Sequence, residues 1–236
     1  MAFNSSSAFF QQKLQKINDA ITIKLAGHVS NPLCYDHLHV GQRLSSFTEV
    51  TIDEVRKLLT SMPAKSSLVD FVPKSAIKEC PELFAEIIAR LATLSFGEGC
   101  FPKKFRSAMV RPLLKKEDLD RNAPCNYRPI SNLNTLSKVQ ERLALVRIRQ
   151  HLITSPNYNR AQSAYRRNHS TESALLRTLD AAYKAMDRGE ATLLVALDIP
   201  AAFDTVVHST LVQRLHSSYG VDGNILAWIT SYLSER

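Results

Sequence analysis

Hydrophobic residues recur every three or four positions along much of this chain, which is the spacing of helices that bury one face. The sequence Thr51–Glu54 has the form of a capping box, and Ser170 is placed as the N-cap of a later stretch. Helices are predicted over 9–25, 51–61, 82–96, 136–152, 170–188, 209–219 and 223–234. In the third of these we expect the larger apolar side chains to face the core: Leu83, Phe84, Ile87, Ile88, Leu91 and Leu94.

Three stretches have the pattern of β-strands. Residues 108–114 and 127–132 flank a charged, turn-rich segment and therefore predict a hairpin. Pro112 restricts the first strand to the edge of a sheet, because proline has no amide hydrogen. Residues 193–197 are continuously apolar, which predicts a short strand buried on both faces. Together these patterns indicate an α+β fold, rich in helices, with a small and mostly antiparallel sheet.

Asp198 follows directly after the predicted buried strand, so its carboxylate would emerge at the end of that strand. Magnesium takes oxygen ligands and is commonly bound by one or two carboxylates together with substrate phosphates. A metal site is therefore one interpretation of Asp198. The alternative is that Asp198 is a turn or cap residue, as most aspartates at strand ends are.

The net charge of the 236-residue chain is +8 and its pI is about 9.4, which favours an anionic partner, with nucleic acid first. Basic residues gather at 103–111, 115–128 and 160–167, and the last two clusters include Tyr127 and Tyr165. Arginine interleaved with aromatic residues suits contact with phosphates and stacking on bases. The alternative is that each cluster is simply a solvated surface.

The remaining composition excludes several classes of protein. The four cysteines are widely spaced and form no C-x-x-C pair, which argues against a zinc ribbon or a redox dithiol. The first residues lack the pattern of a signal peptide, and no stretch approaches the roughly 18 apolar residues of a membrane span. We therefore expect an intracellular protein, with nucleus or cytoplasm unresolved.

Several motifs, taken together and in order, resemble the reverse transcriptase of LINE-type (non-LTR) retrotransposons. The resemblance covers roughly residues 47–236 and implies a right-hand polymerase fold, with fingers over 47–190 and the start of the palm over 191–236. Residues 1–46 would then form an N-terminal helix and a linker. The motifs that carry the resemblance are FPKKFRSAMVRPLLKK at 101–116, NYRPISNLNTLSKVQERL at 126–143, QSAYRRNHSTESALL at 162–176, LDIPAAFDTVVH at 197–208 and LAWITSYLSER at 226–236.

The resemblance also implies roles for individual residues. Asp198 would be the catalytic aspartate that binds the metal ions, expected to be Mg²⁺, and Phe203 would pack under the incoming sugar and exclude a 2′-hydroxyl. The backbone from Ile199 to Ala202 would lie near the triphosphate, and Arg128 would contact its phosphates. Gln162, Tyr165 and Arg166 would lie near the template and the nucleotide pocket. The implied partners are an RNA template, a DNA primer and deoxynucleoside triphosphates.

The chain also departs from the family pattern. It contains no adjacent Asp-Asp pair, the second catalytic motif of these enzymes, so we expect a truncated chain that is inactive alone. Pro200 and Val207 replace residue types that are commoner in the family. The alternatives are a non-catalytic nucleic-acid-binding remnant and a relic without function. At single residues, Phe203 could instead be a core aromatic, Arg128 a salt-bridge partner in its hairpin, and Gln162 and Arg166 ordinary loop residues.

Overall fold

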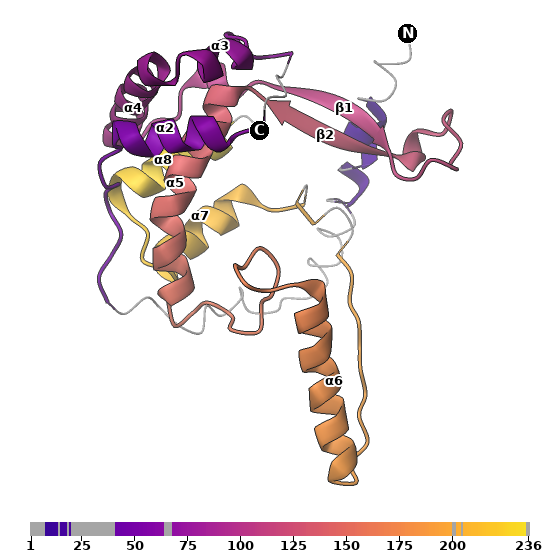
Figure 1. The fold of residues 1–236 in the computed structure, drawn as a ribbon. Helices are drawn as coiled ribbons and strands as arrows, with labels where there is room; N and C mark the ends of the chain where they lie inside the picture. The colour runs from indigo at the N-terminus through magenta and orange to yellow at the C-terminus, as the bar shows by residue number, and fades with distance from the viewer. Residues whose placement is uncertain are drawn as a thin grey trace.

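A computed structural model describes residues 8–13, 15–17, 19, 41–63, 68–199, 202–203 and 205–234. The described fold is helix-rich with one two-stranded antiparallel sheet, which confirms the predicted balance of helix and strand (Figure 1). The elements in chain order are α2 (Ile52–Ser61), α3 (Lys74–Glu79), α4 (Pro81–Gly97), η1 (Lys103–Phe105), β1 (Ala108–Leu114), η2 (Pro124–Asn126), β2 (Tyr127–Leu133), α5 (Thr135–Thr154), α6 (Thr171–Asp187), α7 (His208–Ser217) and α8 (Gly223–Leu233).

Side-chain caps fix the starts of the helices. Thr51 accepts a hydrogen bond from the Glu54 amide at 3.2 Å, and Asn134 accepts one from the Ser137 amide at 2.7 Å. Ser170 forms a complete capping box with Ser173. The predicted helices from 51 onward are confirmed to within about two residues at each end. The described residues between 8 and 19 are helical, and residues 20–25 of that prediction lie outside the described residues. The short helix α3 was not predicted.

The core forms where α2, α4, α5 and α8 meet (Figure 1). An aromatic cluster lies at its centre: the Phe96 and Trp228 rings are 5.5 Å apart edge to face, and Phe101 meets Trp228 at 5.3 Å. The indole of Trp228 donates a 2.9 Å hydrogen bond to the hydroxyl of Ser95, so its polar atom is satisfied inside the core. The C-terminal helix α8 is thereby joined to α4.

Helix α4 confirms only part of its predicted buried face. Ile88 is buried and Phe84 packs against the core, as predicted. Leu83, Ile87 and Leu94 are exposed, and the buried face also contains Ala85, Ala89, Ala92 and Phe96. The alanines let α2 approach α4 closely, because a methyl side chain keeps the two backbones near each other. The prediction was wrong at the three exposed positions because it ranked side chains by size, and close packing between helices selects small residues.

The hairpin β1–β2 confirms the predicted pair of strands. Its register places Leu113 opposite Arg128 and Arg111 opposite Ile130, with Pro112 opposite Pro129. Cross-strand partners and alternate residues share a face, so Arg111 and Arg128 lie on the same face of the hairpin. The two strands extend away from the helices in Figure 1, and most of their side chains are exposed.

The predicted buried strand at 193–197 is wrong. These residues are not in a β-ladder and their side chains are exposed, as shown by Leu193 at 87% and Leu197 at 90%. The segment runs back along α6, and the two project together from the rest of the molecule (Figure 1). A strand requires a neighbouring strand to share its backbone hydrogen bonds, and no described strand lies beside residues 193–197. Helix α6 likewise has no buried residue.

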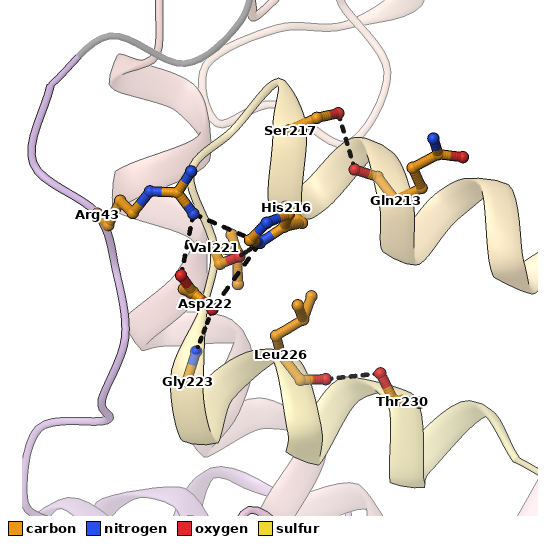
Figure 2. Close-up of polar contacts among 9 residues, drawn as sticks. All are labelled: Arg43, Gln213, His216, Ser217, Val221, Asp222, Gly223, Leu226 and Thr230. Carbon is orange, nitrogen blue, oxygen red and sulfur yellow. Dashed lines mark hydrogen bonds and ion pairs between the residues drawn. The ribbon is translucent and has the colours of Figure 1, made fainter.

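Residues 43–45 cross the start of α8 and hold it in place (Figure 2). The Leu44 amide donates to the Gly220 carbonyl, and the Asp222 amide donates to the Leu44 carbonyl, both at 2.9 Å. Arg43 adds a 3.0 Å ion pair with Asp222. Gly223 has a φ of +51°, and a Cβ there would lie 2.5 Å from the Ser45 carbonyl oxygen, so the crossing requires glycine. Within the described residues, no helix is long and apolar enough to cross a membrane.

Candidate nucleotide and nucleic-acid site

Arg128 is the second residue of β2 and is exposed. Among the described residues it has no ion-pair partner, so the interpretation of Arg128 as a salt-bridge residue of the hairpin finds no support. Arg111 lies diagonally across the hairpin on the same face, since it is opposite Ile130. Two guanidinium groups on one exposed face form a site suited to phosphate oxygens. Sequence reasoning did not single out Arg111, although the alternation of side chains along the predicted hairpin could have found it.

The loop after α5 carries Gln162, Tyr165 and Arg166. Arg166 is held on both sides: its Nη1 donates to the Arg160 carbonyl at 3.1 Å, and its guanidinium lies 5.9 Å from the centre of the Tyr158 ring. Gln162 donates to the Ala164 carbonyl at 3.4 Å, within the same loop. The loop is therefore shaped by its own contacts, and Arg166 is its most firmly positioned cation.

Tyr165 contacts Phe203, although 38 positions separate them in the sequence. Their ring centres are 6.1 Å apart and their planes lie at 77°, an edge-to-face pair. Both rings are open to solvent, with Tyr165 81% exposed and Phe203 78% exposed. The interpretation of Phe203 as a core aromatic is therefore wrong. The contact joins the segment that carries Asp198 to the loop that carries Gln162 and Arg166.

Asp198, Ile199 and Ala202 are all exposed and precede Phe203 in an irregular segment. The Ala202 carbonyl accepts a 3.4 Å hydrogen bond from the Thr205 hydroxyl. Pro200 lies outside the described residues. In the described part of the chain, no three His, Cys, Asp or Glu side chains gather to hold a metal ion. Asp198 thus offers one carboxylate, and the described residues do not complete a metal centre around it.

Two arginines make hydrogen bonds inside the fold: Arg106 of the first basic cluster and Arg147 of α5. Arg106 donates to the Phe101 carbonyl at 3.1 Å and to the Ser231 hydroxyl at 2.9 Å. Arg147 forms an ion pair with Glu54, and its side chain is only 7% exposed. Counting charges along the sequence could not separate these arginines from exposed ones such as Arg128, because that distinction depends on tertiary contacts.

Comparison with known proteins gives concordant matches. A family model described as reverse transcriptase (RNA-dependent DNA polymerase) matches residues 114–236, just over half of this 236-residue chain. The chain is 29% identical over 192 residues to the RNA-directed DNA polymerase from mobile element jockey of Drosophila melanogaster, covering 79% of this chain and 20% of that protein. The jockey protein of Drosophila funebris is 32% identical over 175 residues, covering 71% of this chain and 18% of that protein.

A third relative is the probable RNA-directed DNA polymerase from transposon BS of Drosophila melanogaster. It is 28% identical over 193 residues, which cover 79% of this chain and 20% of that protein. The chain thus spans about a fifth of the length of these relatives. Arg128, the loop with Tyr165, and the segment from Asp198 to Phe203 all lie within the region that the family model matches.

Proposed function

The chain belongs to the reverse transcriptase family, and we propose that it forms the part of a non-LTR retrotransposon RNA-directed DNA polymerase that binds template and incoming nucleotide. In this proposal residues 47–190 form the fingers and 191–236 begin the palm of a right-hand polymerase. The contact between Tyr165 and Phe203 is the observation that carries it. It joins two motifs that are far apart in the sequence into one exposed surface.

The exposed residues supply the chemistry that a nucleotide needs. Arg128, with Arg111 on the same face, offers paired guanidinium donors to the triphosphate, and such charged hydrogen bonds are the strong ones. The aromatic ring of Phe203 packs under the incoming sugar, while Ile199 and Ala202 carry backbone near the triphosphate. The loop with Gln162, Tyr165 and Arg166 lies against the template, and it also borders the nucleotide pocket.

Polymerases of this family generally work with a divalent metal ion, which neutralises charge on the reacting phosphates. We propose Mg²⁺ as that ion and Asp198 as one of its ligands, since hard cations take carboxylate oxygens. Within the described residues no three His, Cys, Asp or Glu side chains gather around a metal position, and the sequence contains no adjacent Asp-Asp pair. The role assigned to this chain is therefore binding and orientation of the template and nucleotide.

Binding of a nucleotide to a blocked primer tests this proposal without requiring catalysis. The substrate is a fluorescent poly(rA) template paired with an oligo(dT) primer that ends in a dideoxynucleotide, with Mg²⁺ present. We expect dTTP to tighten binding of the hybrid and dCTP to leave it unchanged, because only dTTP pairs with the template. Arg128→Ala should weaken the dTTP effect about tenfold or more, since a charged hydrogen bond contributes about 1.5–3 kcal/mol.

Arg90→Ala is the matched control, because Arg90 is an exposed arginine of α4 away from the site. It should keep the full response to dTTP. Equal responses to dTTP and dCTP in the wild type would overturn the proposal. If the hybrid binds and neither nucleotide has an effect, the chain is a nucleic-acid-binding protein without a nucleotide site.

A further inference from the structure

Arg149 connects helix α5 to the loop that carries Tyr165. Its Nη2 donates a 3.1 Å hydrogen bond to the backbone carbonyl of Tyr165, 16 residues further along the chain. We propose that Arg149 is a positioning residue: by holding this carbonyl it fixes the ring of Tyr165 against Phe203, and the two rings form one wall of the nucleotide site. This inference rests on the function proposed above and extends it to a residue outside the motifs.

The backbone of Tyr165 shows why such a contact matters. Its φ is +59°, a left-handed conformation that a bulky aromatic residue rarely adopts and that must be maintained by its surroundings. Asn168, the other described non-glycine residue with positive φ, is of a type that tolerates this conformation. Tyr165 has no such tolerance. The hydrogen bond from Arg149 comes from a regular helix and fixes the carbonyl of the strained residue.

The ring of Tyr165 has little else to hold it. It is 81% exposed and meets Phe203, which is itself 78% exposed, through one edge-to-face contact. Neither ring belongs to the buried core. The relative position of the two rings therefore depends on the backbone of the loop, and the loop depends on its contact with α5.

The wall suits a nucleoside triphosphate. Its aromatic edge and face offer packing surface for a sugar and a planar base, which are uncharged. Arg166 is fixed in the same loop by the Arg160 carbonyl and the Tyr158 ring, so a cation accompanies the rings. A wall of two rings leaves less room beside the sugar than Phe203 alone. Arg149 would thereby influence the discrimination between a 2′-hydrogen and a 2′-hydroxyl.

The experiment compares dUTP with UTP on the blocked poly(rA) hybrid, because these nucleotides pair identically and differ only at the 2′ position. Arg149→Met keeps roughly the length of the side chain and removes its hydrogen-bond donors. We expect this variant to reduce the preference for dUTP over UTP by about tenfold, because it loses one charged hydrogen bond. Affinity for the hybrid alone should stay unchanged. Arg149→Lys retains a charged donor group and should restore much of the preference for dUTP.

A structural measurement accompanies the binding assay. In protein with labelled aromatic rings, the nuclear Overhauser effect between Tyr165 and Phe203 should be present in the wild type and in Arg149→Lys, and lost in Arg149→Met. Arg142→Met, at another exposed arginine of α5, is the matched control and should retain both the ring contact and the preference.

The outcomes distinguish a failure of the role given to Arg149 from a failure of the proposed function. If the wild type prefers dUTP and Arg149→Met keeps that preference, the inference is wrong and the proposed function stands. If Arg149→Met retains the ring contact, Arg149 does not position Tyr165. If the wild type responds to neither nucleotide, the proposed function fails and the inference fails with it.

Discussion

Arg147, in helix α5, stabilises the fold through several contacts of its side chain. Its guanidinium donates to both carboxylate oxygens of Glu54 at 2.8 and 2.9 Å, and to the backbone carbonyls of Thr48, Glu49 and Leu143. It also lies 5.9 Å from the centre of the Phe96 ring. The planar fork of arginine satisfies all these acceptors at once, which the single ammonium group of lysine cannot do.

Arg147→Ala should therefore destabilise the protein by about 3 kcal/mol or more, because removal of one partner from a largely buried ion pair leaves the other unpaired. Arg147→Lys should recover only part of this loss. The free energy of unfolding is measured by urea denaturation, followed through the fluorescence of Trp228, the single tryptophan. Arg90→Ala serves as the exposed control and should change stability by less than about 0.5 kcal/mol. Equal losses at positions 147 and 90 would contradict the buried role of Arg147.

At the scale of elements, helix α8 depends on a polar junction at its first turn (Figure 2). The Asp222 carboxylate accepts a 2.8 Å hydrogen bond from the Gly223 amide and pairs with Arg43. His216, from the last turn of α7, lies 3.8 Å from the same carboxylate. The Gly223 amide is the largest cause that lowers the pKa of Asp222, and the hydrogen bond from Arg43 and the nearby charges of His216 and Arg43 lower it further.

This lowered pKa predicts a dependence of stability on pH. A carboxyl group with a lower pKa in the folded state stabilises that state fully above its ordinary pKa of 3.8, and the effect is lost as pH falls from there through the folded pKa. Asp222→Asn keeps an N-cap acceptor and removes the charge. Its melting temperature should lie below that of the wild type near pH 6 and converge with it below pH 3.8. Melting curves across this range test the prediction.

Asp118→Asn is the control for that series, since Asp118 is an exposed aspartate in the turn of the hairpin. Its melting temperature should follow the wild type at every pH. A gap between wild type and Asp222→Asn that stays constant from pH 6 down to pH 3 would show that the charge of Asp222 does not stabilise the junction.

The helices and strands also show how much of the fold could be predicted from the sequence. Helices with clear periodicity and predicted caps, such as α2 and α6, were predicted to within about two residues. The hairpin was predicted equally well, because its signals are local. The strand predicted at 193–197 was wrong because a strand needs a partner, which is a tertiary property. Which face of α4 is buried, and the formation of the short helix α3, also depend on tertiary packing that periodicity does not encode.

For the candidate site, the motifs indicated the residues but not their arrangement. The resemblance placed both Tyr165 and Phe203 near the nucleotide, but the edge-to-face contact between their rings is visible only in the fold. Arg149 lay outside every motif, and only the fold shows its bond to Tyr165. The roles of Asp198, Arg128 and Gln162 stay predictions.

For the whole molecule, the charge of +8 is distributed unevenly between surface and interior. Arg106 and Arg147 make hydrogen bonds inside the fold, so they are not free to contact phosphates. The turn of the hairpin, by contrast, carries Lys116 and Arg121 in exposed positions. In Figure 1 the hairpin projects from one side of the helices, and α2 and α4 lie on the other side. The exposed cations of the hairpin are therefore the better candidates for contact with a nucleic acid.

This distribution predicts how salt should affect binding of an RNA–DNA hybrid. Each phosphate that a protein neutralises contributes about 0.9 to the slope of log affinity against log salt for a duplex. The double variant Lys116→Ala/Arg121→Ala should reduce that slope by up to roughly 2, since it removes two such contacts. Lys57→Ala/Arg90→Ala removes the same charge from exposed positions on α2 and α4 and should leave the slope nearly unchanged. Equal slopes for the two double variants, measured by fluorescence anisotropy over a range of salt concentrations, would mean that net charge and not the hairpin governs binding.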